Sequence, residues 1–309
     1  MTRIVSLLPA ATEMICGIGL REQLVGISHE CNWPLGLDAL PRVTRSRVDS
    51  SVDSAAIDAQ VKQFAASGES FYEIDADQIA ALRPTLIVTQ GECCDVCAVS
   101  LSAVEELVAG RPELAGTPIV PLDPKSLAEV LADIERIGVA AGANAAAVEY
   151  AHSLRQRVDA IRAATKNATK QPLATKRRVV VIEWIEPLMA AGNWTPELVD
   201  IAGGDYGLAT AGRPSPYVAW EEIVAFQPEV LIVAPCGFDL ERSEREAQRL
   251  TRLPGWNQLP AVVQKKATVI DGDAYLNRPG PRLVESLELL HQLLAAPAFA
   301  GHPAARSLA

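Results

Sequence analysis

A chain of 309 residues with 49% apolar side chains is long enough for two domains and can bury a large core. Its formal net charge of −10 argues against nucleic acid as a partner, because that partner requires a basic surface. No stretch approaches the ~18 consecutive apolar residues that would predict insertion into a membrane.

The chain opens with MTRIVSLLPAATE, which enters a strand almost at once and shows no signal-peptide pattern. We therefore expect a cytoplasmic protein, or a periplasmic one if a leader was trimmed. In the cytoplasm, cysteines serve as thiols or metal ligands rather than as disulfides.

Short apolar runs alternate with helical patterns in the first part of the chain. Continuous apolarity is typical of strands in a parallel sheet that helices cover on both faces. This alternation predicts an N-terminal α/β lobe over residues 1–123. Strands are predicted at 3–7, 24–28, 85–89 and 118–122.

Residues 124–175 link this lobe to the next. A helical pattern is interrupted at GAN and continues as a long helix near 145–165, which would span roughly 30 Å. The polar stretch KNATKQPLATKRR follows it. A helix of this length suits a rigid strut between two lobes.

A C-terminal α/β lobe is predicted over residues 176–309, with strands at 178–184, 230–235 and 267–272. DQIAALRPTLIVTQ and EEIVAFQPEVLIVAP each read as a helix, a proline and an apolar strand, which favours two related lobes. The predicted fold is therefore α/β, with two Rossmann-like lobes of parallel strands, one long connecting helix and a ligand cleft between the lobes.

Several chemically useful side chains follow the predicted strands. Ligands of open parallel sheets bind beyond the carboxyl ends of the strands, so these residues are the candidates for the cleft. They are Glu30, Cys31, Trp33, Gln90, Cys94, Cys97, Glu183, Trp184, Trp194, Cys236, Tyr275, Asn277 and Arg278. The tryptophans could stack on a planar ligand or cap a loop, and Arg278 could pair with an acidic ligand or with a carboxylate of its own lobe.

The cysteines allow three interpretations. Cys31, Cys94, Cys97 and Cys236 could hold zinc or an iron–sulfur cluster, since the C-x-x-C spacing lets two thiolates bind one metal. They could instead be small buried hydrophobes, which is the interpretation that we favour for Cys16. A thiol enzyme would use Cys94 or Cys97 as its nucleophile, with His29 or Glu30 as the base.

The chain resembles the substrate-binding proteins of cobalamin and ferric-siderophore ABC transporters. The resemblance is carried by RIVSLLPAATEMICGIGL, LVGISHECNWP, DADQIAALRPTLIVTQ, EEIVAFQPEVLIVAP and RPGPRLVESLELL, and it covers nearly the whole chain. It implies two α/β lobes joined by one long helix, a bound corrinoid or iron chelate, and no catalysis. In place of the aromatic side chains that cobalamin-binding relatives have after the second and fourth strands, this chain has Glu30 and Gln90.

The resemblance also implies an ABC permease as a partner. Asp77 and Glu221 match by position the carboxylates that dock onto permease arginines in that family. The alternative is that both carboxylates simply favour the start of a helix. We expect a monomer or a dimer.

Overall fold

The computed structural model describes residues 2–91, 98–169 and 176–308. Its contacts divide the chain into two units. Unit 1 comprises Met1–Val52, Ala56–Pro124 and Ala128–Leu154, and unit 2 comprises Asp53–Ala55, Lys125–Leu127 and Arg155–Ala309. Each unit is described by itself below.

Unit 1 is built around a parallel sheet in the order β2-β1-β5-β6. The strands are β1 (Ile4–Ser6), β2 (Leu24–Ile27), β5 (Leu86–Gln90) and β6 (Ile119–Leu122). A separate antiparallel pair consists of β3 (Thr44–Ser46) and β4 (Tyr72–Ile74). The helices are α1 (Pro9–Gly17), α2 (Ser54–Ser67), α3 (Ala76–Leu82), α4 (Leu101–Gly110) and α5 (Leu127–Ala141), with short 3-10 turns at η1 (Arg21–Gln23) and η2 (Pro112–Leu114).

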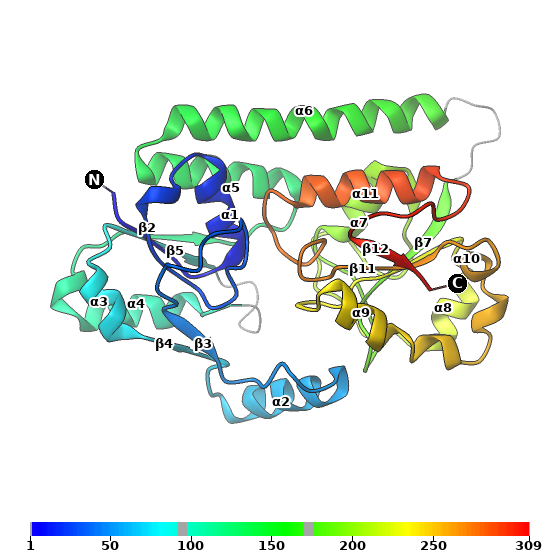
Figure 1. Cartoon of the computed structure of the whole chain (residues 1–309), viewed down its shortest axis with the longest axis horizontal. Helices are drawn as coiled ribbons and strands as arrows, with labels where there is room; N and C mark the ends of the chain where they lie inside the picture. Colours follow the sequence, from blue (N-terminus) through cyan, green and yellow to red (C-terminus); the bar gives the residue numbers. More distant parts are fainter. Residues whose placement is uncertain (1, 92–97, 170–175, 309) are drawn as a thin grey trace. The chain divides into compact units, whose positions relative to one another are not determined.

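Helices cover both faces of this sheet, with α1 and α5 on one side and α3 and α4 on the other (Figure 1). The central strands β1 and β5 are buried along their whole length, which explains why apolar residues predominate in their sequences. Side-chain caps start two of the helices. The Asp75 carboxylate accepts the backbone N–H of Gln78 at 2.9 Å, and the Ser100 hydroxyl accepts that of Ala103 at 3.3 Å.

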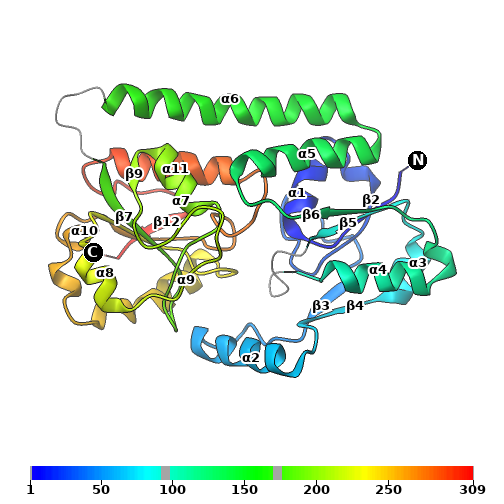
Figure 2. The same cartoon turned by 180° about the vertical axis from the view of Figure 1, so that it is seen from behind.

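Unit 2 contains a mixed sheet in the order β12-β11-β10-β7-β8, with β9 also paired to β7. Strands β7 (Arg177–Trp184), β10 (Val230–Val233) and β11 (Ala267–Ile270) are parallel, whereas β8 (Met189–Ala190) and β12 (Ala305–Ser307) run antiparallel to their neighbours, and β9 (Gly204–Asp205) is parallel to β7. The helices are α7 (Thr195–Ala202), α8 (Trp220–Phe226), α9 (Leu240–Ala247), α10 (Pro260–Val263) and α11 (Leu283–Ala295), with η3 (Leu250–Arg252) and η4 (Trp256–Gln258). Figure 2, drawn from behind, shows α7 and α11 together on one side of the sheet.

The longest helix, α6 (Asn144–Thr169), belongs to both units, because its residues up to Leu154 group with unit 1 and those from Arg155 with unit 2. In unit 1 it packs closely on α5, since a Cβ at Gly138 would lie 2.2 Å from that of Ala147. In unit 2, Arg157 makes a bidentate ion pair with Glu288 of α11 at 2.7 and 2.8 Å. The predicted long helix is confirmed.

The repeated helix–proline–strand pattern has the same backbone form in both units. The C-cap residue of α3 is Arg83 (φ 45°, ψ 60°) and that of α8 is Gln227 (φ 52°, ψ 60°), and both have the left-handed conformation. Pro84 and Pro228 follow directly. The helical conformation is disfavoured at a residue that precedes proline, so both helices end before these positions. The α/β fold class with parallel strands is confirmed, and these matching corners support an internal repeat.

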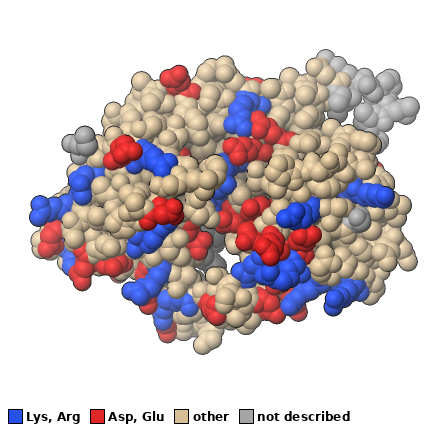
Figure 3. Space-filling view, in the orientation of Figure 1, with Lys and Arg blue, Asp and Glu red and all other residues tan. Residues whose placement is uncertain are grey.

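Acidic and basic side chains are intermixed over the face drawn in Figure 3, so that face presents no continuous basic surface. None of the helices in the described ranges combines the length and the apolarity that crossing a membrane requires.

Candidate functional site

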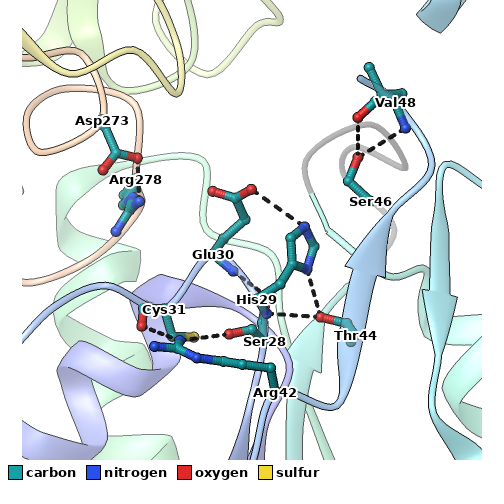
Figure 4. Close-up of polar contacts among 10 residues, drawn as sticks. All are labelled: Ser28, His29, Glu30, Cys31, Arg42, Thr44, Ser46, Val48, Asp273 and Arg278. Atoms are coloured by element: carbon teal, nitrogen blue, oxygen red, sulfur yellow. Dashed lines mark hydrogen bonds and ion pairs between the residues drawn. The ribbon is translucent and has the colours of Figure 1, made fainter. Parts of the chain in front are cut away.

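In unit 1, His29 and Glu30 lie in the loop after β2, with Ser28 between the strand and His29. His29 Nδ1 lies 2.8 Å from the Thr44 hydroxyl oxygen, and its Nε2 lies 3.4 Å from Glu30 Oε1 (Figure 4). Burial lowers the pKa of His29, and the neighbouring Glu30 carboxylate offsets part of that effect. A neutral His29 therefore accompanies a partly exposed Glu30 carboxylate at neutral pH.

Cys31 is completely buried, in contrast to its exposed neighbours in the same loop. Its sulfur lies 3.0 Å from the Thr12 hydroxyl of α1, and its carbonyl oxygen accepts a hydrogen bond from Arg42 (Figure 4). Cys16, which we expected in the core, is only partly buried.

Two further predicted site residues in unit 1 differ in exposure. Trp33 is 41% exposed, so its indole is accessible at the surface, whereas Gln90 at the end of β5 is buried. Cys94 and Cys97 lie outside the described residues. Within the described ranges no three His, Cys, Asp or Glu side chains come together as a metal site. Metal binding by the four cysteines therefore stays a prediction.

Unit 1 also holds a cavity of about 460 Å³ at the ends of β5 and β6, which we call the strand-end cavity. Asp123 follows β6, while Asp133 and Arg136 come from α5. Arg136 donates to Asp133 Oδ1 at 2.7 Å and to the Pro121 carbonyl at 2.8 Å. The described residues that line the cavity are Gly91, Leu101, Pro121, Asp123, Pro124, Glu129, Ala132, Asp133 and Arg136.

In unit 2, Glu183 lies near the end of β7 and is held in place by a hydrogen bond from Ser215, which is itself bonded to the backbone. Its Oε2 accepts the Ser215 hydroxyl at 2.8 Å, and the Ser215 oxygen accepts the backbone N–H of Gly192 at 2.9 Å. Burial raises the pKa of Glu183, and the hydrogen bond from Ser215 opposes that shift. The side chain is thus a fixed acceptor at the carboxyl end of a central strand.

Two aromatic side chains, one at the end of β7 and one in the loop after β10, contact each other in a tilted arrangement. The rings of Trp184 and Phe238 lie 5.3 Å apart, and the Arg242 guanidinium lies 3.6 Å from the centroid of the Phe238 ring. The Trp184 indole N–H donates to the Glu186 carbonyl at 3.1 Å. These contacts fix a partly buried Trp184 beside Glu183.

Cys236 and Trp194, both predicted for the cleft, have different surroundings in unit 2. Cys236 is exposed, and its backbone N–H donates to the Glu183 carbonyl at 3.0 Å. Trp194 is buried, and its indole N–H donates to the Leu276 carbonyl at 2.5 Å. This contact ties the start of α7 to the loop that follows β11.

The loop after β11 carries Tyr275, Asn277 and Arg278, all partly buried. Asn277 Nδ2 donates to the carbonyls of Ala234 at 2.9 Å and Gly272 at 2.7 Å, so it joins the turns after β10 and β11. Arg278 pairs with Asp273 in its own unit (Figure 4), which is one of the two outcomes considered from the sequence.

The two predicted docking carboxylates are exposed in their respective units. Asp77, in the first turn of α3, is 87% exposed and lies 2.7 Å from Arg111 Nη2. Glu221 occupies the first turn of α8. Asp77 remains accessible despite this ion pair, because its side chain is largely exposed. A pair this exposed also contributes little to stability.

Comparison with known proteins shows which protein family this chain resembles. The family model described as "Periplasmic binding protein" matches residues 4–274, which is most of the chain. The chain belongs to the periplasmic binding protein family. The resemblance inferred from the sequence is therefore confirmed.

Three similar proteins illustrate the range of this periplasmic binding protein family. The vitamin B12-binding protein of Vibrio cholerae serotype O1 is 25% identical over 299 residues, covering 93% of this chain and 86% of its own. A periplasmic heme-binding protein from Pseudomonas aeruginosa has a TM-score of 0.72 at 20% identity, covering 99% of this chain and 97% of its own. An ABC-type Fe3+-hydroxamate transport protein from Saccharomonospora viridis has a TM-score of 0.65 at 20% identity, covering 95% and 93%.

At these identities the two solved structures establish the fold of this periplasmic binding protein and not its ligand. The iron–sulfur alternative finds no support in the comparisons. The sequence did not predict Ser215 and Asp133 as site residues, although Ser215 donates to Glu183 and Asp133 lines the strand-end cavity. A serine in a loop and an aspartate in a helix carry no motif. Both residues lie close to strand ends, but this proximity becomes visible only in the folded structure.

Proposed function

We propose that this chain is the substrate-binding protein of an ABC transporter for a corrinoid or an iron chelate. The observation that carries this proposal is the family match over residues 4–274, and the names of the similar proteins supply the ligand classes. The ligand is held without covalent chemistry by side chains that follow parallel strands.

The strand-end side chains support this proposal chemically. Trp33 and Trp184 offer indole surfaces to a planar macrocycle, and Glu30 and Glu183 offer hydrogen-bond acceptors. A fixed acceptor such as Glu183 costs little further ordering when a ligand binds, because Ser215 already holds it.

Binding without catalysis accounts for the cysteines more simply than the alternatives do. The thiol of Cys31 is buried against Thr12, so it would have to be uncovered before it could bind a metal. A thiol enzyme would use His29 or Glu30 as its base, and these two side chains face each other, with His29 Nε2 3.4 Å from Glu30 Oε1.

Titration of the protein with vitamin B12, heme and an iron–hydroxamate, followed by tryptophan fluorescence, tests the proposal. We expect saturable binding of at least one of them at one site per chain, with a dissociation constant of roughly 1 μM or tighter. Absence of binding to all three would refute the proposal.

Docking to a permease is the second part of the proposal, and Asp77 and Glu221 are its carboxylates. Both are exposed and lie in matching places, in the first turn of the helix that precedes Pro84 or Pro228. Complementary charges on a permease would orient the loaded protein on its partner.

Reversing both charges with Asp77→Arg and Glu221→Arg should lower transporter-dependent uptake of the ligand roughly tenfold or more, because like charges would then meet arginines. Ligand affinity of the purified variant should not change. Glu105→Arg and Glu241→Arg are matched controls, since both residues are exposed on other helices. Equal uptake by the variant and the controls would remove these residues from the docking surface.

We also propose that the protein acts in the periplasm rather than in the cytoplasm. The matching family model is described as a periplasmic binding protein, the solved protein from Pseudomonas aeruginosa is named periplasmic, and the cytoplasmic expectation finds no support in the comparisons.

A further inference from the structure

Tyr217 of unit 2 is an exposed aromatic residue at the carboxyl end of β7 that the sequence did not single out. Of the aromatic side chains in the described ranges, Trp33 and Tyr217 are the two that are exposed, and Tyr217 is 58% accessible. Its backbone pairs with Met189 of β8, and Met189 pairs in turn with Trp184, the last residue of β7. These three residues form a line across neighbouring segments, which we call the Trp–Met–Tyr row.

Met189 and Tyr217 lie side by side on one face of the sheet. The N–H of Val218 donates to the Leu188 carbonyl at 3.0 Å, and a second bond of the same length joins the residues on the other side of the pair. In an antiparallel pair flanked in this way the Cα atoms lie about 4.5 Å apart, so the side chains touch. Leu188 and Val218 pack on the hydrophobic core, so alternation directs Met189 and Tyr217 to the opposite face.

Trp184 reaches this same face because the register of β7 shifts. Ile182 pairs with Ala190 and Trp184 pairs with Met189, so Glu183 is an extra residue on β7, as in a β-bulge. In a regular strand Trp184 would share the face of Ile182, which lies in the hydrophobic core. The extra residue instead brings Trp184 beside Met189.

Hydrogen bonds fix the segment that carries Tyr217. Ser215, two residues before it, donates to Glu183 at 2.8 Å and accepts the backbone N–H of Gly192 at 2.9 Å. A Cβ on Gly192 would lie 2.6 Å from the Ser215 backbone nitrogen, so the segment packs directly on this turn. The backbone of Tyr217 is therefore in position before a ligand arrives, and binding does not have to order it.

We propose that a tetrapyrrole macrocycle, either a heme or a corrinoid, lies on the Trp–Met–Tyr row with Tyr217 as a contact residue, and that the protein discriminates against iron hydroxamates. This inference rests on the proposed function and narrows its ligand class. The row is two strand spacings wide, roughly 10 Å. A tetrapyrrole offers a flat face of comparable width to aromatic and thioether side chains, whereas a hydroxamate chelate encloses its iron in a compact shell.

Titration of the purified protein with hemin, cyanocobalamin and ferrioxamine B, followed by tryptophan fluorescence, compares the two ligand classes. We expect at least one macrocycle to have a dissociation constant roughly tenfold or more below that of ferrioxamine B, because only the macrocycle covers the whole row. Whichever macrocycle binds identifies the source of the shared chemistry.

Substitutions of Tyr217 then assign this preference to the row. Tyr217→Ala should raise the dissociation constant of the macrocycle roughly three- to tenfold, because it removes one aromatic surface. Tyr217→Phe should retain the wild-type affinity, because the ring face and not the hydroxyl makes the contact. Val263→Ala is the control, since Val263 is 67% exposed in the same unit but lies on α10, which precedes β11. This control should leave the affinity unchanged.

Binding of ferrioxamine B as tightly as either macrocycle would overturn the inference while the proposed function stands. The inference also fails if Tyr217→Ala binds the macrocycle as the wild type does, if Tyr217→Phe loses as much affinity as Tyr217→Ala, or if Val263→Ala loses as much. Failure of all three compounds to bind would refute the proposed function itself, and the inference with it.

Discussion

The turns after β10 and β11 approach each other so closely in unit 2 that residue 272 must be glycine. A Cβ built on Gly272 would lie 2.0 Å from the Pro235 carbonyl oxygen and 2.7 Å from the Pro235 carbonyl carbon. Ordinary contacts of this kind begin near 3.4 Å, so Gly272→Ala requires the two backbones to separate by about 1.4 Å. The obstacle is main chain, which cannot rotate away as a side chain can.

That separation would also break a tie between the two turns. Asn277 Nδ2 donates to the Ala234 carbonyl at 2.9 Å and to the Gly272 carbonyl at 2.7 Å, and it cannot keep both bonds if they move apart by more than 1 Å. Overpacking costs about 1–3 kcal/mol, and the lost hydrogen bond adds to it. We expect Gly272→Ala to lower the free energy of unfolding by about 3 kcal/mol.

Urea unfolding, followed by circular dichroism and tryptophan fluorescence, measures this loss as a lower transition midpoint at an unchanged slope. Gly110→Ala is the matched control, because nothing lies within 4 Å of a Cβ at the last residue of α4. That control should be neutral or more stable by up to about 1 kcal/mol. Unfolding of Gly272→Ala within 0.5 kcal/mol of the wild type, on the order of measurement error, would refute the reasoning.

Two further predictions concern buried charges in unit 2. Burial raises the folded-state pKa of Glu183 above the ordinary 4.5, so the wild type should lose stability as the pH rises from about 4.5 through that folded-state value. The Glu183→Gln variant should lack this loss. Its free energy of unfolding in urea should therefore exceed that of the wild type at pH 7 but not near pH 4. A difference between the two proteins that does not change with pH would contradict this. Burial lowers the pKa of Lys266 to about 8 from 10.5, so the wild type should gain stability relative to Lys266→Met as the pH rises from about 8 to 10.5, and parallel pH profiles would contradict this.

The parallel strands could be predicted from the sequence because each is a short, continuously apolar run. RIVSL contains β1, TLIVT overlaps β5, and RVVVIEW matches all but the first residue of β7. The pair β3–β4 could not be predicted in this way. Its strands, TRS and YEI, are only three residues long and pair across the whole of α2, so neither periodicity nor a short turn marks them.

The site was predictable as a set of strand ends but not in its detail. Glu183 and Trp184 were found because they end an apolar run, whereas their partners Ser215 and Phe238 come from loops whose course depends on tertiary packing. Burial was equally hidden from the sequence. Cys31 and Trp33 stand two residues apart, yet one is fully buried and the other is 41% exposed.

The absorption spectrum of the protein purified anaerobically from cells grown with corrinoid and heme tests the central claim most directly. The account predicts corrinoid or iron-chelate bands, one ligand per chain, and recovery of the ligand chemically unchanged after denaturation. Those bands should persist in a Cys31→Ser variant. An iron–sulfur spectrum that disappears with that substitution, or a ligand that is recovered chemically altered, would contradict the account.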